Sequence, residues 1–197
     1  MTSPKLKKVL DIICRRLESE HIFHALIGAG ALALYGMPRF TADIDLLAEQ
    51  QKHGSIRKIM NELGFDCFQD TETFAQFDSE LGVYGKVDFM FVQTDDGMAV
   101  LERAVHVTDA FWGNITVVQP TDYAVLKLMA IANNPERKAH DTADLETLFR
   151  AAAAGFMDFH TFTPIDAERL KAFAEKFDIK AHLECLLPLL ENNAQHL

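Results

Sequence analysis

Cysteine is scarce in this chain, and its few cysteines are not grouped into a framework. The 197 residues include only Cys14, Cys67 and Cys185, which are far apart in sequence and set among apolar residues. Disulfide frameworks and structural zinc sites need closely grouped, usually even-numbered cysteines, so this distribution excludes both. We therefore expect reduced thiols and a cytoplasmic protein.

Long hydrophobic runs and basic charge are also in short supply. The longest apolar stretch, residues 25–37, contains three glycines and is too short to cross a bilayer, so no membrane association is expected. The formal net charge is −10, and the deficit of basic residues lies in residues 61–197, where ten Lys and Arg face 23 Asp and Glu. Phosphate neutralisation drives general nucleic-acid binding, which a chain of this charge does poorly.

What the chain does have is an acidic pair in an apolar context. Asp43 and Asp45 lie within a predicted strand, Ala42–Ala48, and the two-residue period of a strand turns both carboxylates to one face. At a separation of about 4 Å they would repel each other by roughly 4 kcal/mol in a partly screened site. A bound cation is the functional explanation, whereas a solvated strand edge or turn is the alternative.

A third carboxylate, Asp88, interrupts the strongest predicted strand, Gly85–Val92. Carboxylates are rarely buried without a cationic partner, although Lys86 on the same side also allows a solvent-facing edge strand. Three acids from two strands would suit one or two Mg²⁺ ions, which prefer a few carboxylates together with substrate phosphate oxygens. Such ions can activate a hydroxyl and stabilise a leaving pyrophosphate.

Two segments then reveal a family resemblance. A small-residue turn, Ile27-Gly28-Ala29-Gly30, precedes the run Arg39-Phe40-Thr41-Ala42-Asp43-Ile44-Asp45, and this order resembles the signature of the nucleotidyltransferase superfamily. Lys127, followed by the stretch 137–145, resembles later motifs of small bacterial members, including AbiEii-type toxins. The resemblance covers roughly residues 23–148.

The resemblance implies a metal-dependent enzyme that transfers a nucleotidyl group from a nucleoside triphosphate to a hydroxyl acceptor. It assigns catalysis and Mg²⁺ binding to Asp43, Asp45 and Asp88. The nucleotide-binding residues that it implies are Gly28, Ala29, Arg39, Thr41, Lys127 and Asp141. Ala29 departs from the pattern, because the family usually has Gly or Ser there and alanine offers no hydroxyl to a phosphate.

Partners follow from the same resemblance. The acceptor is left open among RNA, a protein hydroxyl and a small molecule, and a cognate antitoxin is implied. The alternative is a catalytically inactive nucleotide-binding or protein-interaction module of the same fold. A third reading treats the acids as surface residues of a structural α/β protein.

Three residues of the later helices have plain structural alternatives. Lys127 is equally compatible with a surface helix lysine, and Asp144 is expected to cap or brace its helix. We expect His140 to lie at a solvated helix start.

The predicted fold is α/β of the α+β type, a nucleotidyltransferase-type mixed sheet flanked by helices and followed by a C-terminal helical bundle. We expect an α/β domain over residues 1–119 and a helical region over residues 120–197. The sequence also predicts a short helix at Ala31–Tyr35 and a β-hairpin with its turn at Trp112–Asn114. The expected C-terminal helices are Thr121–Asn133, Thr142–Ala154, Asp166–Phe177 and Ile179–Leu190.

Overall fold

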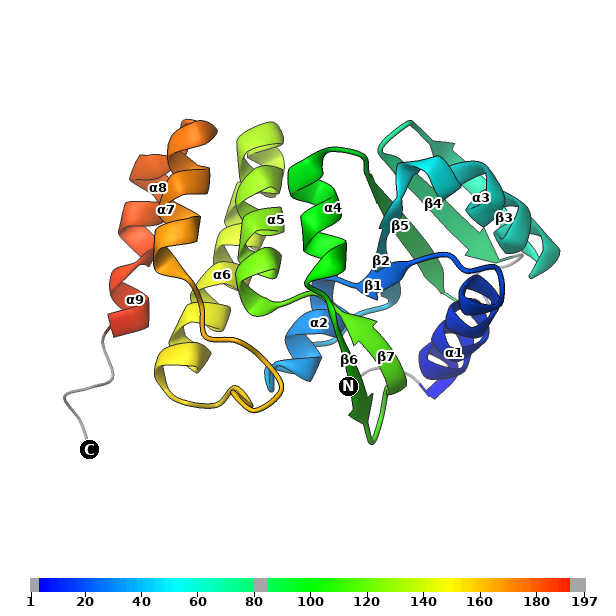
Figure 1. Ribbon diagram of the computed structural model, residues 1–197, viewed down its shortest axis with the longest axis horizontal. Helices are drawn as coiled ribbons and strands as arrows, with labels where there is room; N and C mark the ends of the chain where they lie inside the picture. Colours follow the sequence, from blue (N-terminus) through cyan, green and yellow to red (C-terminus); the bar gives the residue numbers. More distant parts are fainter. Residues whose placement is uncertain (1–3, 80–84, 192–197) are drawn as a thin grey trace. The chain divides into compact units, whose positions relative to one another are not determined.

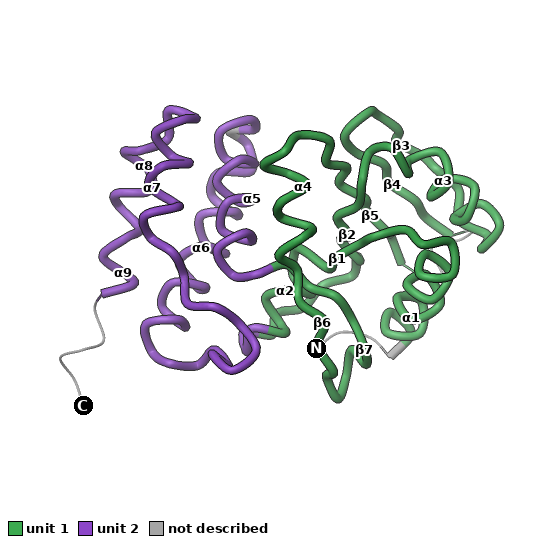
Figure 2. The backbone as a smooth tube through the Cα atoms, in the orientation of Figure 1, with its two compact units in different colours: residues 1–34, 38–118 green, residues 35–37, 119–197 purple. Residues whose placement is uncertain are grey.

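The computed structural model of the protein describes residues 4–79 and 85–191 and divides into two compact units. The first unit comprises residues 1–34 and 38–118, and the second comprises residues 35–37 and 119–197 (Figure 2). The first is built on a β-sheet, and the second consists of helices and their connections.

Within the described residues, the first unit contains a seven-stranded mixed sheet in the order β3-β4-β5-β2-β1-β7-β6 (Figure 1). Parallel pairs join β2 to β5 and β1 to β7, and the other neighbouring strands are antiparallel. The strands are β1 (His24–Leu26), β2 (Asp43–Glu49), β3 (Phe65–Asp70), β4 (Phe74–Ser79), β5 (Lys86–Val92), β6 (Val105–Asp109) and β7 (Gly113–Val117). This arrangement confirms the predicted mixed sheet with accompanying helices.

Alternation along the central strands separates a core face from a polar face. Ile44 and Leu46 on β2, with Phe89 on β5, are 0–2 % exposed and belong to the core. Asp43 and Asp45 alternate with Ile44 and Leu46 along β2. They therefore lie on the opposite face of the sheet, where both are half-buried. The helices of this unit are α1 (Pro4–Ser19), α2 (Gly28–Leu34), α3 (His53–Glu62) and α4 (Asp95–Glu102), with a short 3₁₀ turn at Gln50–Lys52.

Two local predictions in this unit are wrong in position. Helix α2 begins at Gly28, three residues before the predicted start, so the small-residue turn is itself the first turn of the helix. The hairpin turn lies at residues 110–112, because Asp109 pairs with Gly113 and both Gly113 and Asn114 belong to β7. Asp109 fixes this turn by accepting hydrogen bonds from the backbone N–H groups of Phe111 and Trp112 through Oδ1, at 2.8 and 2.7 Å.

The second unit has a core of aromatic and aliphatic side chains between its helices. The Tyr35 ring makes edge-to-face contacts with Tyr123 and Phe162, at centroid distances of 5.8 and 4.9 Å. Asp122, fully buried near the start of α5, forms an ion pair with Arg169. The helices are α5 (Pro120–Asn133), α6 (Lys138–Ala153), α7 (Ala167–Lys176), α8 (Lys180–Leu186) and α9 (Pro188–Glu191), with a 3₁₀ turn at Pro135–Arg137.

The predicted last helix, Ile179–Leu190, is in fact two helices. Helix α8 ends at Leu186 and α9 begins at Pro188. Proline has no N–H to donate, and its ring clashes with the carbonyl four residues earlier. Pro188 is accommodated at the first position of a new helix, where its N–H is not required.

Candidate active site

The three carboxylates of the predicted catalytic set lie on one face of the sheet. Strands β2 and β5 are parallel neighbours, and Asp45 is the direct Cα partner of Asp88. Asp43 is two residues from Asp45 and so shares its face. Because paired residues on adjacent strands point to the same side, the side chains of Asp43, Asp45 and Asp88 converge on the polar face.

The glycine bend at the start of α2 lies directly against this acidic face. Gly28 has a φ of +59°, and a Cβ atom added to it would lie only 2.1 Å from Oδ2 of Asp45. The backbone N–H of Ile27 donates to the carbonyl oxygen of Asp45 at 2.9 Å. Gly28 therefore serves two needs at once: a left-handed conformation and close approach of the backbone to a carboxylate.

The remaining predicted residues of this unit flank the acids. Thr41 lies just before β2, where its Oγ1 donates to the Asp43 carbonyl at 3.0 Å and accepts from the Asp43 N–H at 3.2 Å. Arg39, two residues earlier, is half-buried. Ala29 is 2 % exposed, so its methyl group belongs to the core. Thr41 thus sets the start of the acidic strand.

Asp88 has an unusual hydrogen-bonding pattern. Its Oδ2 accepts a hydrogen bond from Nε2 of Gln76 at 3.0 Å, and Gln76 is its Cα partner on the antiparallel strand β4. Its Oδ1 is buried and has no hydrogen-bond partner among the described residues. Such an oxygen is costly unless a proton or a cation completes it.

The electrostatics of the acidic face raise the proton affinity of Asp88. Burial is the largest cause and raises the pKa of Asp88 to about 6. The hydrogen bond from Gln76 lowers this pKa, and the charges of Asp45 and Asp43 raise it. Asp88 is therefore a carboxylate that exchanges its proton not far below neutral pH.

The two predicted residues of the later helices form a buried ion pair in the second unit. Nζ of Lys127 on α5 lies 2.7 Å from Oδ1 of Asp141 and 2.8 Å from Oδ2 of Asp144, both on α6. The residues are 8 %, 0 % and 5 % exposed, respectively. Tyr123 also donates to Oδ2 of Asp144 at 3.3 Å. The surface alternative for Lys127 is wrong. Asp144 does not cap α6 but braces it against α5 through Lys127 and Tyr123, which confirms the second of its two expected roles.

His140 extends this cluster toward solvent. Its Nδ1 lies 3.6 Å from Asp141 and 3.8 Å from Asp144, and its side chain is 58 % exposed, as expected of a solvated helix start. Together these three residues have the composition of a metal site. However, the ammonium group of Lys127 already forms an ion pair with each of the two carboxylates, and a metal ion would have to displace it.

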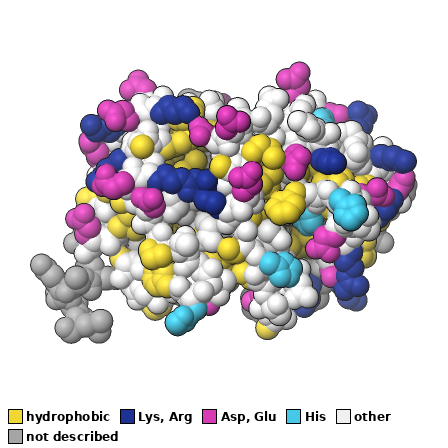
Figure 3. Space-filling model, in the orientation of Figure 1, with side chains coloured by type: hydrophobic (Ala, Val, Ile, Leu, Met, Phe, Trp, Pro, Cys, Tyr) yellow, Lys and Arg dark blue, Asp and Glu magenta, His cyan; other side chains and the backbone are white. Residues whose placement is uncertain are grey.

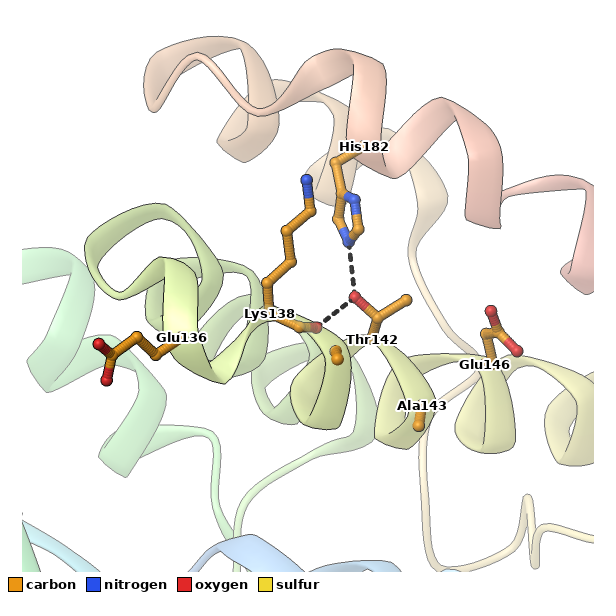
Figure 4. A pocket seen from close by; sticks show the side chains of 7 residues that line it. Glu136, Lys138, Thr142, Ala143, Glu146 and His182 are labelled. Atoms are coloured by element: carbon orange, nitrogen blue, oxygen red, sulfur yellow. Dashed lines mark hydrogen bonds between the residues drawn. The ribbon is translucent and has the colours of Figure 1, made fainter.

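A separate pocket of about 510 Å³ in the second unit contains none of the predicted site residues. In this pocket, Oγ1 of Thr142 lies 3.0 Å from Nε2 of His182 and donates to the Lys138 carbonyl at 2.6 Å (Figure 4). Glu136 and Glu146 lie at its two ends. The opposing charges on its walls do not favour one class of ligand.

The molecular surface carries mixed charge. On the face drawn in Figure 3, acidic and basic side chains are interspersed with small apolar patches. Among the described residues, none of the helices combines the length and the apolar character that a membrane span requires.

Sequence reasoning missed Gln76 and Tyr123. Gln76 is the central polar residue of Phe74-Ala75-Gln76-Phe77, and this alternation places it opposite the core. Its proximity to Asp88, however, depends on the register of β4 against β5. Tyr123 lies four residues before Lys127 on a helix, a spacing that places both side chains on one face.

Known structures share this fold. The antibiotic-resistance factor ANT(2'')-Ia has a TM-score of 0.63 at 12 % identity, over 91 % of this chain and 95 % of that one. An antigenic nucleotidyltransferase-like protein of Paracoccidioides brasiliensis has a TM-score of 0.54 at 17 % identity, over 96 % of this chain and 94 % of that one. The lincosamide antibiotic adenylyltransferase LnuA has a TM-score of 0.52 at 15 % identity, over 75 % of this chain and 96 % of that one. At these identities the likeness establishes the fold alone.

No curated protein matches the chain. A family model, described as the nucleotidyl transferase AbiEii toxin of type IV toxin–antitoxin systems, matches residues 10–194. This match covers nearly the whole sequence and includes the acidic strands, the glycine bend and the Lys127 cluster. The chain therefore belongs to the AbiEii nucleotidyl transferase toxin family.

Proposed function

We propose that this protein transfers a nucleotidyl group from a nucleoside triphosphate to a hydroxyl acceptor, with Mg²⁺ bound by Asp43, Asp45 and Asp88. The observation that carries the proposal is the register of β2 and β5, which pairs Asp45 with Asp88 beside the Gly28 bend. Family membership supplies the class of reaction. We further propose that residues 1–119 form the nucleotidyltransferase domain and residues 120–197 a helical region.

The carboxylates fit a divalent metal. Three of them share one sheet face, and Oδ1 of Asp88 is a buried acceptor without a hydrogen-bond partner among the described residues. Oxygen ligands from a few carboxylates, completed by phosphate oxygens, are what Mg²⁺ prefers. When bound, Mg²⁺ would supply charge neutralisation at the phosphates and activation of the acceptor hydroxyl.

The chain's own residues would hold the triphosphate next to the acids. Gly28 has no side chain, so the backbone of the bend can approach a phosphate while it remains packed against Asp45. Arg39 would contribute a bidentate guanidinium to phosphate oxygens. Thr41 would act mainly through the backbone of Asp43, because its hydroxyl forms hydrogen bonds with both the N–H group and the carbonyl oxygen of Asp43.

Asp88 is the residue best suited to take the acceptor's proton. With a pKa of about 6, it is mostly ionised at neutral pH yet basic enough to accept a proton. Asp43 and Asp45 would bind the cation, and Asp88 would help to bind it or take the acceptor's proton.

Lys127 and Asp141 remain proposed nucleotide-binding residues. Asp141 and Asp144 hold the Lys127 ammonium in one position. A fixed ammonium would serve as a point charge for a phosphate, with Asp141 orienting it. As a family member, the protein would also have a cognate antitoxin that counteracts its activity.

A second candidate is a nucleotide-binding or protein-interaction module of the same fold without catalysis. Ala29 favours this candidate. The chain has alanine where the family usually has Gly or Ser, so this position offers no hydroxyl to a phosphate, and the methyl group of Ala29 is buried. In this case the acids would bind a nucleotide and cation but support no transfer.

The two candidates differ in a radiolabelled-nucleotide transfer assay with each NTP, Mg²⁺, and RNA, protein and small-molecule acceptors. We expect transfer by the wild type and its loss in Asp43→Asn, Asp45→Asn and Asp88→Asn. The matched control is Asp66→Asn, an exposed acid on β3, which should retain activity. Nucleotide binding without any transfer would favour the module, and transfer undiminished in all three variants would eliminate the assigned roles.

A further inference from the structure

We propose that Gln76 is a positioning residue that orients the Asp88 carboxylate for the metal, an inference that rests on the proposed function. Gln76 belongs to β4, a strand that carries none of the three acids. It nevertheless contacts Asp88 through a direct side-chain hydrogen bond of 3.0 Å.

The register makes this contact a fixed part of the sheet. Gln76, Asp88 and Asp45 occupy successive strands β4, β5 and β2 and are Cα partners of one another in turn. They therefore form one row across the polar face, with Asp88 in the middle. Gln76 holds Asp88 from one side, and Asp45 approaches it from the other.

The Gln76 amide acts on one oxygen only. Its N–H group donates to Oδ2 of Asp88, so the carboxylate cannot rotate without losing that bond. Oδ1 is then the oxygen left without a hydrogen-bond partner among the described residues. A carboxylate fixed in this way presents one oxygen in a constant direction, which a hard cation such as Mg²⁺ requires.

The same bond fixes Asp88 within the row. Without the amide, the Asp88 carboxylate could rotate away from the direction in which it presents Oδ1. Removing the amide should therefore weaken metal binding even though Gln76 would not touch the ion.

Mn²⁺ titration, followed by electron paramagnetic resonance and calorimetry without nucleotide, tests this inference independently of activity. Gln76→Leu and Gln76→Met keep the approximate size of the side chain but remove its donor and add no charge. Both should weaken Mn²⁺ binding about tenfold or more, the usual effect of losing a partner that orients a metal ligand. Gln76→Asn should restore part of the affinity, because it keeps the amide on a shorter side chain.

The matched control is Gln69→Leu. Gln69 is the Cα partner of Gln76 on β3 and is exposed, so it changes the same face one strand further from Asp88. Its Mn²⁺ affinity should equal that of the wild type. Thermal unfolding of each variant verifies the fold, and if Gln76→Leu does not fold, Gln76→Met provides the same comparison.

The outcomes separate this inference from the proposed function. Wild-type affinity in Gln76→Leu or Gln76→Met, together with loss of affinity in Asp88→Asn, would overturn the role of Gln76 alone. Equal weakening in Gln69→Leu would also overturn it, because the effect would not depend on the hydrogen bond. Failure of the wild type to bind Mn²⁺ would overturn the metal site itself, and with it this inference.

Discussion

Asp45 and Asp88 face each other across the parallel pair β2–β5, and the missing side chain of Gly28 leaves room for the Asp45 carboxylate. One strand register and one glycine thus bring together a backbone bend and two acids that are more than forty residues apart in sequence.

Replacing Gly28 by alanine should destabilise the protein more than replacing another left-handed glycine. In Gly28→Ala the new methyl group would overlap Asp45, whereas the position of Cβ at Gly64 has no atom within 4 Å. Both glycines have positive φ, +59° and +81°, so both variants bear the backbone cost of about 1–3 kcal/mol. Overpacking should add about 1–3 kcal/mol in Gly28→Ala alone. Urea unfolding measures the difference, and equal losses in Gly28→Ala and Gly64→Ala would contradict the close approach.

The raised pKa of Asp88 predicts a pH-dependent stability of the metal-free protein. The folded-state pKa of about 6 exceeds the ordinary value of 3.8, so between about pH 4 and 6 the folded state retains a proton that the unfolded state has released. The contribution of Asp88 to stability is thus present at low pH and is lost as pH rises through about 6. In EDTA, Asp88→Asn should gain stability relative to the wild type between pH 4.5 and 7. A difference that does not change with pH would contradict the prediction.

Lys127→Met should be strongly destabilising. It leaves Asp141 and Asp144, which are 0 % and 5 % exposed, without the ammonium that forms an ion pair with each of them. Removing one partner of a buried ion pair typically costs about 3–5 kcal/mol. The control is Lys171→Met, whose ion pair with Glu168 is exposed and should contribute little to stability. Denaturant unfolding of both variants provides the comparison, and similar small losses would show that the buried cluster contributes little.

Restoring charge balance in the cluster should recover part of that loss. In the double variant Lys127→Met/Asp144→Asn only one buried carboxylate remains, so its stability should exceed that of Lys127→Met. The same unfolding measurement tests this, and a double variant less stable than Lys127→Met would show that the loss has another cause.

The cysteines should differ sharply in reactivity. Burial raises the pKa of the Cys14 thiol to about 12, with Glu18 and Asp11 adding to the effect. Since the thiolate is the nucleophile, Cys14 should resist iodoacetamide at pH 8 in the folded protein, whereas the exposed Cys185 should react. Mass spectrometry of the alkylated peptides identifies the modified thiols. Rapid labelling of Cys14 under native conditions would contradict its burial in α1.

Local sequence patterns explain much of the fold. The alternation of Ile44 and Leu46 with Asp43 and Asp45 is enough to predict a strand with two acids on one face. The apolar stripe of α1 predicts its buried side in the same way. Family resemblance adds the order of the motifs, and the comparisons with known proteins confirm the family and the fold.

The remaining features depend on contacts between distant segments. Gly28 and Gly30 disfavour a helix locally, yet α2 includes both. Glycine is needed at these positions because a Cβ at Gly28 would collide with Asp45 and a Cβ at Gly30 would collide with Leu26. The surroundings of Lys127 require α6 to pack on α5, which a single lysine between two leucines does not reveal. The contact between Gln76 and Asp88 cannot be predicted from the sequence for a related reason, since it arises only from the register between β4 and β5.

The most direct test of the central claim is a crystal structure of the protein soaked with Mn²⁺ and a non-hydrolysable NTP analogue, with the ions located by anomalous scattering. We expect Mn²⁺ to be bound by Asp43, Asp45 and Asp88 and by phosphate oxygens of the analogue beside Gly28. Mn²⁺ bound instead at His140, Asp141 and Asp144, or a nucleotide bound away from the three acids, would contradict it.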